Sequence, residues 1–328
     1  MMEKLIADFP ANIDEALEIA KNSTFQKPTK EIHNIVFCGM GGSGFGGKLV
    51  AKWIEDEIKL PFIVVQDYTI PNFVNENTLV IGSSYSGNTE ETLISIEAAR
   101  SKGAHIVCIS SGGKLKAFCD EHNYDCVVVP GGNPPRTALA YSMVQIGNIL
   151  VQHGFINGRI LDQMAGSGEL LRAKIGEIQQ EGRKLAEFMH GKFPMIYTET
   201  KYEPIAIRAR QQFNENSKIL CACNPIPEMN HNELVGWGGG DNRYAALFMY
   251  TSDMHPRNRR RMEINHEVIS QRTPHTYQLN AVGNNCVEES IYLIHILDWA
   301  SFYLTDINGA DVIEIRVIDH LKGELAKF

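Results

Sequence analysis

Short apolar runs alternate with longer amphipathic stretches from about residue 33 onward. The runs are rich in β-branched residues and cover 34–38, 62–66, 79–83, 105–110 and 126–130. Their continuous apolarity is typical of strands that are buried on both faces of a parallel sheet. The stretches between them combine turn residues with a helical period, as in TEETLISIEAARSKG. This alternation predicts an α/β fold in which helices flank an open, mainly parallel sheet.

A second alternation of the same kind follows a long polar stretch. Residues 155–192 are charged and have a helical period, which predicts a connecting helix. Further apolar runs then occur at 193–199, 218–223, 244–251 and 275–279. A strongly apolar helix is predicted over 290–304, and the segment DHLKGELAKF closes the chain. We therefore predict two α/β domains, residues 1–153 and residues 154–328, the second of which includes the connector and a C-terminal helix.

Composition and charge argue against a membrane-spanning, secreted or nucleic-acid-binding protein. The chain is 44% hydrophobic and 21% charged, it has no apolar run long enough to cross a bilayer, and its N-terminal segment lacks an apolar signal core. Seven cysteines at irregular spacing are typical of reduced thiols, so we expect a cytoplasmic protein. A net charge of −8 argues against nucleic-acid or membrane partners. The basic cluster at 257–261 is interpreted as a solvated helix face or an interface patch.

The glycine-rich segment CGMGGSGFGG follows the first predicted strand and allows backbone amides to approach an anion closely. Gly39, Gly41 and Gly44 fit the dinucleotide fingerprint. Asp67 closes the next apolar run, where a ribose-binding acid belongs. A nucleoside triphosphate loop is excluded, because Leu49 stands where magnesium needs a hydroxyl. The segment alone therefore leaves three readings open: a dinucleotide site, a site for a small phosphorylated metabolite, or a turn that binds nothing.

A second candidate loop, GSSYSGNTEETL, follows the third predicted strand. Its hydroxyl side chains are Ser83, Ser84, Ser86 and Thr89. Asn88 and Glu91 have the spacing of a capping box, which predicts that a helix begins near Thr89. Hydroxyls beside the first amides of a helix form a phosphate cradle without Lys or Arg, although a capped turn with solvated serines has the same pattern. Two such loops at the carboxyl ends of strands favour a small phosphorylated ligand.

The segments SYSGNTEET and GMGGSG resemble the sugar-isomerase (SIS) domain, and nearly the whole chain resembles the bifunctional phosphoglucose/phosphomannose isomerase family. The resemblance implies two SIS-type domains that interconvert glucose 6-phosphate and fructose 6-phosphate through a cis-enediol. It also implies that Ser84, Ser86 and Thr89 hold the sugar phosphate, and that Gly42 and Ser43 line the pocket beside the reacting carbons. This chemistry requires no cofactor, and none is predicted.

The same resemblance implies roles for two residues of the second half. Glu215, in FNENSK, would be the base that moves a proton between C1 and C2, although without the resemblance it is a solvated acid at a helix end. His231, in PEMNHNELVGW, would open the sugar ring from the neighbouring subunit, which implies a homodimer with a shared active site. Asn230 and Glu233 have capping-box spacing, which predicts His231 in a first helical turn, where the dipole disfavours imidazolium.

Two cations complete the implied site. Arg136, in GGNPPRTALAY, is predicted at a helix start, where the dipole disfavours a cation, so we expect it to have a partner, such as a structural carboxylate. The resemblance instead implies that Arg136 stabilises the enediolate, and that Lys322, in IDHLK, points back to the site from the C-terminal helix. Family members usually have Asp-Pro-Thr where this chain has residues 311–313, Asp-Val-Ile. Because that Thr is associated with accepting the mannose epimer, activity on mannose 6-phosphate is left open.

Two other classes of function are weighed against the isomerase. A non-catalytic SIS module that senses a sugar phosphate needs none of Glu215, His231 and Arg136, so their presence favours an enzyme. An NAD-dependent oxidoreductase is the third hypothesis. No metal is predicted, because the segment from Asn265 begins like H-E-x-x-H but has Ser270 in place of the second histidine.

Overall fold

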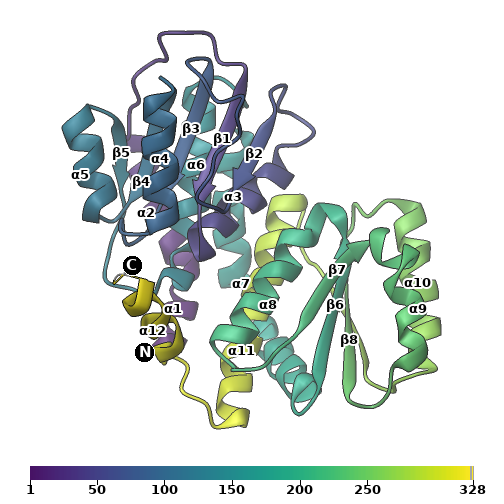
Figure 1. Cartoon of the computed structure of the whole chain (residues 1–328). Helices are drawn as coiled ribbons and strands as arrows, with labels where there is room; N and C mark the ends of the chain where they lie inside the picture. Colours follow the sequence, from purple (N-terminus) through teal and green to yellow (C-terminus); the bar gives the residue numbers. More distant parts are fainter. Residues whose placement is uncertain (326, 328) are drawn as a thin grey trace. The chain divides into compact units, whose positions relative to one another are not determined.

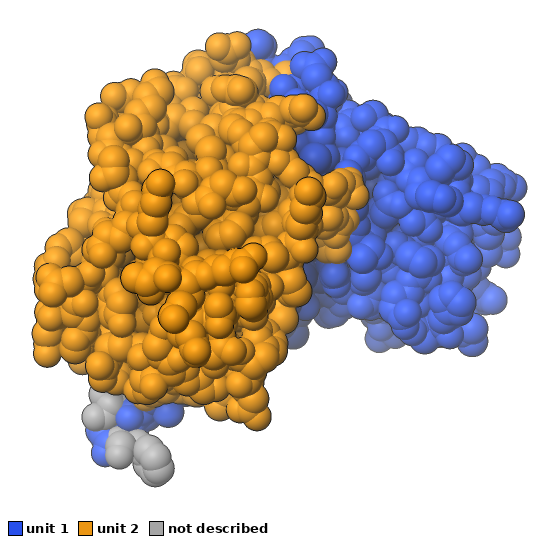
Figure 2. Space-filling view, turned by 90° about the horizontal axis from the view of Figure 1, so that it is seen from above, with its two compact units in different colours: residues 1–7, 173–328 blue, residues 8–172 orange. Residues whose placement is uncertain are grey.

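The computed structural model of the chain describes residues 1–325 and Lys327 (Figure 1). The chain forms two compact units, Asp8–Arg172 and Met1–Ala7 with Ala173–Phe328 (Figure 2). The long helix α7, Arg159–Met189, belongs to both units. The predicted domain boundary after residue 153 precedes this helix, whereas the compact units divide within it. Residues 1–7 belong with the second half of the chain, which the order of predicted strands does not indicate.

The unit Asp8–Arg172 contains one parallel sheet. Its strands are β1 (Asn34–Gly39), β2 (Phe62–Val65), β3 (Thr78–Ser83), β4 (His105–Ser110) and β5 (Asp125–Val128). Their order in the sheet is β2-β1-β3-β4-β5, and all neighbouring strands are parallel. Each strand coincides with one of the predicted apolar runs, so the predicted α/β architecture is confirmed.

Helices cover both faces of this sheet. They are α2 (Phe9–Asn22), α3 (Gly41–Trp53), α4 (Glu90–Ser101), α5 (Gly113–His122) and α6 (Leu139–Gln152). On one face, Ile96 of α4 and Leu115 of α5 pack against Val36, Val80 and Ile106 of the central strands. Helices α3 and α6 pack against each other on the other face (Figure 1). The first core is therefore a helix–sheet–helix sandwich.

The other unit repeats the architecture with four strands. They are β6 (Phe193–Glu199), β7 (Ala222–Ile226), β8 (Tyr244–Tyr250) and β9 (Thr276–Asn280), parallel throughout and ordered β7-β6-β8-β9. The run 218–223 was predicted as a strand, but β7 begins only at Ala222. Lys218 has a left-handed φ of 57°, which is incompatible with an extended strand, and pairing with β6 begins only at Ala222.

The helices of this unit are α1 (Met2–Ala7), α8 (Glu203–Glu215), α9 (Glu233–Gly236), α10 (Pro256–Ser270), α11 (Cys286–Asn308) and α12 (Arg316–Leu325). The buried helix α11 extends beyond the predicted range at both ends. Asn285 caps its start by accepting from the amides of Val287 and Glu288, and Gly309, with a left-handed φ of 62°, follows its last residue. Within the described part of the chain, no helix is both long and apolar enough to span a membrane.

A buried polar cluster joins α8 to α11. Arg208 Nη2 lies 2.7 Å from Asp298 Oδ2, and Gln212 Nε2 donates to Asp298 Oδ1 at 2.9 Å. His295 is fully buried beside them and accepts from Trp299 Nε1 at 3.2 Å. Burial, reinforced by the positive charge of Arg208, lowers the pKa of His295 to about 3. The ring is therefore neutral in the folded protein at neutral pH.

Replacing His295 by Gln should reduce the dependence of stability on pH. A depressed pKa gives the folded state its full advantage above the unfolded pKa of about 6.5, and this advantage is lost as the pH falls. Between about pH 7.5 and about pH 5.5, the parent should lose about 1.4 kcal/mol more unfolding free energy than His295→Gln. Urea unfolding at both pH values measures this difference, and exposed His33→Gln is the control. Equal losses in the parent and His295→Gln would contradict the prediction.

Candidate functional site

The carboxyl edge of the first sheet has a crevice between β1 and β3. Helix α3 follows β1 and leads to β2, whereas α4 follows β3 and leads to β4 on the opposite side. The connections after β1 and β3 therefore run to opposite faces of the sheet. Open α/β sheets bind their ligands at such a switch point. The first turn of α3 with Gly42 and Ser43, here called the glycine loop, and the hydroxyl loop from Ser84 to Thr89 both lie at this point.

The strand order argues against the dinucleotide hypothesis. In the usual dinucleotide fold β3 lies beyond β2, whereas here β3 pairs with β1 on the side away from β2. Asp67, the candidate ribose-binding acid, accepts instead from the amide of Tyr68 at 2.7 Å. Its carboxylate thus serves a local turn, and the fold corresponds to the other common class of doubly wound sheets.

A hydrogen bond joins the glycine loop to the hydroxyl loop. Ser43 Oγ accepts from the backbone amide of Tyr85 at 3.2 Å, and Ser43 is buried at the start of α3. Ser84 is also buried, with 1% of its surface exposed, and its hydroxyl donates to Thr89 Oγ1 at 2.8 Å. Ser86 is exposed, and Thr89 is half-buried. Ser84 therefore braces the loop, while the hydroxyls of Ser86 and Thr89 are the more accessible ones.

The conformation of the hydroxyl loop depends on Gly87. Its φ of 69° is left-handed, and a Cβ there would lie 1.8 Å from the carbonyl oxygen of Gly112. The amide of Gly87 donates to Ser84 O at 3.0 Å, and its carbonyl accepts from the amide of Leu115 at 2.9 Å. The loop is thus packed against the following βα loop, which fixes its shape before any ligand binds.

The predicted capping box of α4 is wrong. The N-cap is Thr89, and among the described residues no side chain caps the first amides of α4. Asn88 instead donates to Ser86 O at 3.1 Å and accepts from the amide of Lys114 at 3.2 Å. The amides at the start of α4 therefore remain available at the positive end of the helix dipole, beside Ser86 and Thr89.

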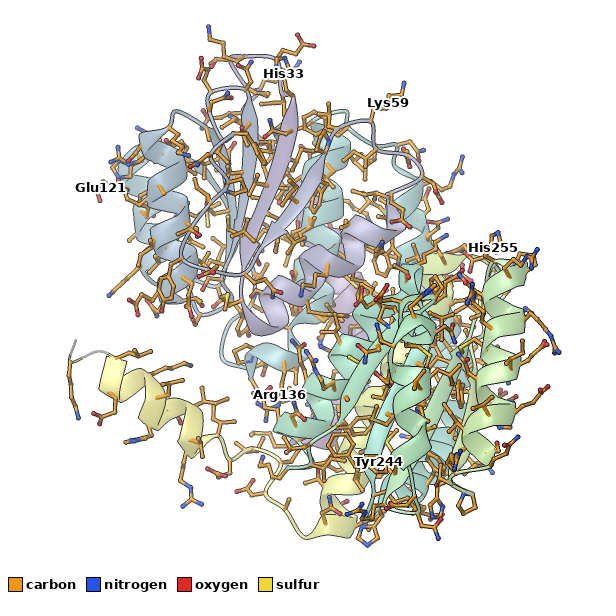
Figure 3. The ribbon with its side chains drawn as sticks, turned by 45° about the vertical axis from the view of Figure 1, so that its right-hand side comes forward. His33, Lys59, Glu121, Arg136, Tyr244 and His255 are labelled. Carbon is orange, nitrogen blue, oxygen red and sulfur yellow. The ribbon has the colours of Figure 1, made fainter. Side chains whose placement is uncertain are left out.

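Arg136 lies in a short 3-10 helix, Pro135–Thr137, ahead of α6, and is 5% exposed (Figure 3). This turn packs closely on the glycine loop, since a Cβ on Gly42 would lie 2.9 Å from Pro135 O. A small pocket between them is lined by Gly42, Ser43, Tyr85, Pro135 and Tyr141. The structure thus gathers the glycine loop, the hydroxyl loop and the Arg136 turn within one unit.

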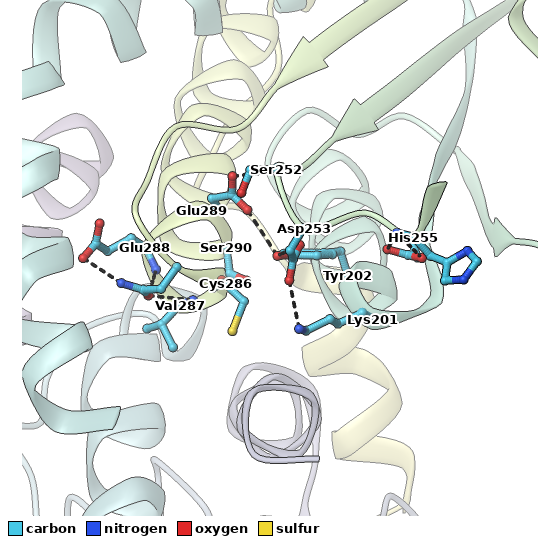
Figure 4. Close-up of polar contacts among 12 residues, drawn as sticks. Lys201, Tyr202, Ser252, Asp253, His255, Cys286, Val287, Glu288, Glu289 and Ser290 are labelled. Carbon is cyan, nitrogen blue, oxygen red and sulfur yellow. Dashed lines mark hydrogen bonds and ion pairs between the residues drawn. The ribbon is translucent and has the colours of Figure 1, made fainter. Parts of the chain in front are cut away.

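The second sheet has a corresponding switch point between β6 and β8, but its residues are acidic (Figure 4). Glu199, at the end of β6, accepts from the amide of His255 at 3.2 Å and from Asn258 Nδ2 at 2.6 Å. Glu289, in the first turn of α11, accepts from the amide of Ser252 at 2.9 Å. Backbone amides that would bind an anion at this edge already bind carboxylates of the chain.

A tyrosine and a lysine complete this acidic cluster. Tyr202 Oη donates to Asp253 Oδ1 at 2.6 Å, and Lys201 Nζ lies 2.9 Å from Asp253 Oδ2. Burial alone would raise the pKa of Asp253, but the hydrogen bonds from Tyr202 and Lys201 bring it below its ordinary value. At this edge, carboxylates of the chain stand where a phosphate would need hydrogen-bond donors.

Glu215 is the last residue of α8 and is half-buried. The next two residues are buried and bound to α11: Asn216 Nδ2 donates to Ser301 Oγ at 2.9 Å, and Ser217 Oγ donates to Ser301 O at 2.6 Å. Sequence reasoning did not single out Asn216 or Ser217, because their partner is distant in the sequence. Glu215 also lines a hollow together with Leu220 and with Val317 and Ile318 of α12.

His231 is exposed at the end of a 3-10 helix, Glu228–His231. The predicted capping box is wrong here too, because Asn232 caps α9 by accepting from the amide of Glu233 at 2.6 Å. Asn230 instead donates to Asn265 Oδ1 at 2.6 Å. His231 therefore precedes α9, and the argument that a helix dipole keeps its ring neutral does not apply.

Lys322 is exposed on α12, a helix without a buried residue in its described range. It belongs to the same compact unit as Glu215 and His231, whereas Arg136, the glycine loop and the hydroxyl loop belong to the other unit.

Comparisons with known proteins identify the family. Residues 30–124 match the SIS domain family, and residues 178–325 match the bacterial phospho-glucose isomerase C-terminal SIS domain. The chain is 35% identical over 313 residues to the bifunctional phosphoglucose/phosphomannose isomerase of Aquifex aeolicus, covering 94% of each chain. The protein belongs to the bifunctional phosphoglucose/phosphomannose isomerase family. The resemblance found in the sequence is thereby confirmed.

Further relatives agree with this family assignment. The family member from Caldicellulosiruptor bescii is 34% identical over 337 residues, covering 99% of each chain. Among solved structures, the C-terminal domain of glucosamine-fructose-6-phosphate aminotransferase from Francisella tularensis superposes with a TM-score of 0.74 over 95% of this chain and 96% of that one. At 17% identity, this likeness shows the fold alone.

The hydroxyl loop predicts how phosphate affinity responds to substitution. Ser86→Ala with Thr89→Ala should weaken binding of fructose 6-phosphate, because each lost hydrogen bond to a charged group costs about 1.5–3 kcal/mol, or roughly tenfold to a hundredfold in Kd. Calorimetric titration measures the change. Ser101→Ala, at the opposite end of α4, is the control and should bind like the parent. Parent-like affinity in the double variant would remove this loop from the site.

Proposed function

We propose that the protein interconverts glucose 6-phosphate and fructose 6-phosphate by moving a proton between C1 and C2 through a cis-enediol. The observation that carries the proposal is the pair of glycine and hydroxyl loops at the β1/β3 crevice of a chain that belongs to this family. Relatives named as phosphoglucose/phosphomannose isomerases support the reaction class. Such an isomerisation transfers no hydride to an external acceptor, so it needs only acid, base and electrostatic groups.

In this proposal the first unit binds the phosphate. Ser86 and Thr89 donate hydroxyl hydrogen bonds, and the uncapped amides of α4 face the same anion. Ser84 holds Thr89 in place, and Gly42 and Ser43 form the wall beside the reacting carbons. Because the whole chain has a charge of −8, the affinity must come from these local donors.

The proton transfer is assigned to Glu215 and Arg136. Glu215 is the base that removes the proton from C1 or C2 and returns it to the other carbon. Its backbone is held by the bonds of Asn216 and Ser217 to α11, which supports a fixed position for the carboxylate. Arg136 stabilises the negative charge that develops on the enediolate oxygen. Its burial beside the glycine loop strengthens such an interaction, because little water screens it.

Ring opening is assigned to His231, with Lys322 as a further cation near the sugar. His231 is exposed on its own unit, which suits a residue that acts on a sugar held elsewhere. We infer a cytoplasmic homodimer in which His231 enters the active site of the neighbouring subunit. The Asp-Val-Ile sequence at 311–313 departs from the family's Asp-Pro-Thr, so a coupled assay on mannose 6-phosphate decides whether the second activity is retained.

Replacing Glu215 by Gln should abolish the chemistry without abolishing binding, because the side chain keeps its size but loses the base. Turnover should fall by about 10²–10⁴-fold, the usual effect of losing one acid–base group. Exchange of the C2 hydrogen of glucose 6-phosphate with solvent deuterium, followed by NMR, should stop as well. Glu187→Gln, on the exposed side of α7, is the control. Exchange at the parent rate in Glu215→Gln would place the base elsewhere.

A shared active site predicts complementation between inactive variants. Mixing Glu215→Gln with His231→Ala should form heterodimers that contain one intact composite site and recover partial activity. Native mass spectrometry confirms that heterodimers form, and each variant mixed with itself is the control. Heterodimers without recovered activity would show that both residues act within one chain.

A further inference from the structure

The segment that carries His231 is exposed at its centre and anchored at both ends. Here the His231 segment means residues 228–237. His231 is exposed, and Val235 is 82% exposed. In contrast, Met229 and Trp237, near the two ends, are buried in the core of their unit. The segment is therefore buried near both ends and exposes His231 to solvent between them.

The first anchor is on α10. Asn265 is fully buried there, accepts from Asn230 Nδ2 at 2.6 Å and donates to Met229 Sδ at 3.5 Å. This fixes the turn that immediately precedes His231.

The second anchor is Tyr197, a fully buried residue of β6. Its hydroxyl donates to the carboxylate of Glu233 and accepts from Trp237 Nε1 at 2.8 Å. Asn224, on the neighbouring strand β7, donates to the other oxygen of Glu233. Burial and the negative charge of Glu233 raise the pKa of Tyr197, so the phenol keeps its proton and remains a donor. One hydroxyl therefore ties two residues of the His231 segment to the centre of the sheet.

Bonds inside the segment connect the two anchors. Asn232 accepts from the amide of Glu233 at 2.6 Å and donates to Glu228 Oε1 at 3.0 Å. The exposed His231 is thus flanked in the sequence by Asn230, which α10 holds, and by Glu233, which the sheet holds. Burying a phenol costs free energy unless its hydroxyl makes hydrogen bonds. Here those bonds go to an exposed segment, which restricts the positions that the segment can adopt.

We propose that Tyr197 is a positioning residue that, through Glu233 and Trp237, fixes His231 in the orientation needed for proton transfer during ring opening. This inference rests on the proposed function of His231. It goes beyond that function by assigning catalytic importance to a buried hydroxyl that does not touch the sugar. The ring of Tyr197 packs on Phe248, at 5.4 Å between centroids, so Tyr197→Phe removes only the hydroxyl and leaves the packing.

A double-mutant cycle tests whether Tyr197 acts through His231. Tyr197→Phe should lower kcat by ~10- to ~100-fold in the parent, because small misplacement of a catalytic group has effects of this size. On the residual kcat of His231→Ala the same change should have less than about a twofold effect, since the group that Tyr197 positions is gone. An equal loss in both backgrounds would overturn the proposal, because it would show a general structural effect.

Tyr202→Phe is the matched control, because it also removes a buried hydroxyl bound to a carboxylate of the same unit. It should lower stability without the dependence on His231. If Tyr197→Phe fails to fold, Glu233→Ala replaces it, because it removes the carboxylate that accepts from Tyr197 and Asn224, and the cycle should give the same coupling. The absence of coupling in Glu233→Ala would equally overturn the proposal.

Amide hydrogen exchange provides a readout that does not depend on isomerase activity. Residues 228–236 should exchange faster in Tyr197→Phe than in the parent and in Tyr202→Phe. Unchanged exchange would overturn the anchor itself. An inactive parent whose segment loosens as expected would instead refute the proposed function, and with it the catalytic role of the anchor. The two failures are thereby distinguishable.

Discussion

The parallel arrangement of β1 and β3 is the constraint on which the candidate site depends. Parallel strands bring the starts of the following helices to one edge of the sheet, and the opposite directions of α3 and α4 open a crevice there. The backbone of Gly42 can then approach the turn that carries Arg136, and Gly87 packs its loop against the next one. An anion at this edge is held by amides and hydroxyls whose positions the sheet has already fixed.

The two sheets show that topology determines where a ligand can bind, while side chains decide which ligand binds. Both sheets have a switch point, and amides are directed toward the carboxyl edge of each. At the first, small hydroxyl residues and uncapped amides leave positive potential for an anion. At the second, Glu199 and Glu289 occupy the amides and Asp253 remains ionised between Tyr202 and Lys201. The same architecture therefore presents amides and hydroxyls at the carboxyl edge of one sheet and carboxylates at that of the other.

The sequence predicts the strands well because buried parallel strands are continuous apolar runs, a signal that is local. It fails where the outcome depends on a distant partner. Asn88 and Asn230 both have capping-box spacing, but their side chains bind Lys114 and Asn265, which no local pattern reveals. The late start of β7 has the same cause, since the turn that delays it is held by bonds from Ser217 to α11. The hydroxyl loop could be proposed as a phosphate site because its hydroxyl residues are contiguous in the sequence, whereas the supports of Glu215 and His231 come from other elements.

The residues that hold Glu215 and His231 in place have one feature in common: they are buried, whereas the residues that they position are more exposed. If Glu215 and His231 act on the sugar as proposed, burial cannot fix them, because burial would hide them from the ligand. Hydrophobic contact is also non-directional and would leave an exposed loop free to rotate, whereas hydrogen bonds fix both distance and angle. The chain therefore buries the partners instead of the functional group: Ser301 holds the residue that follows Glu215, and Tyr197 and Asn265 hold the residues on either side of His231. Buried polar groups of this kind are costly unless every bond is made, and that cost makes one orientation of the exposed residue strongly preferred.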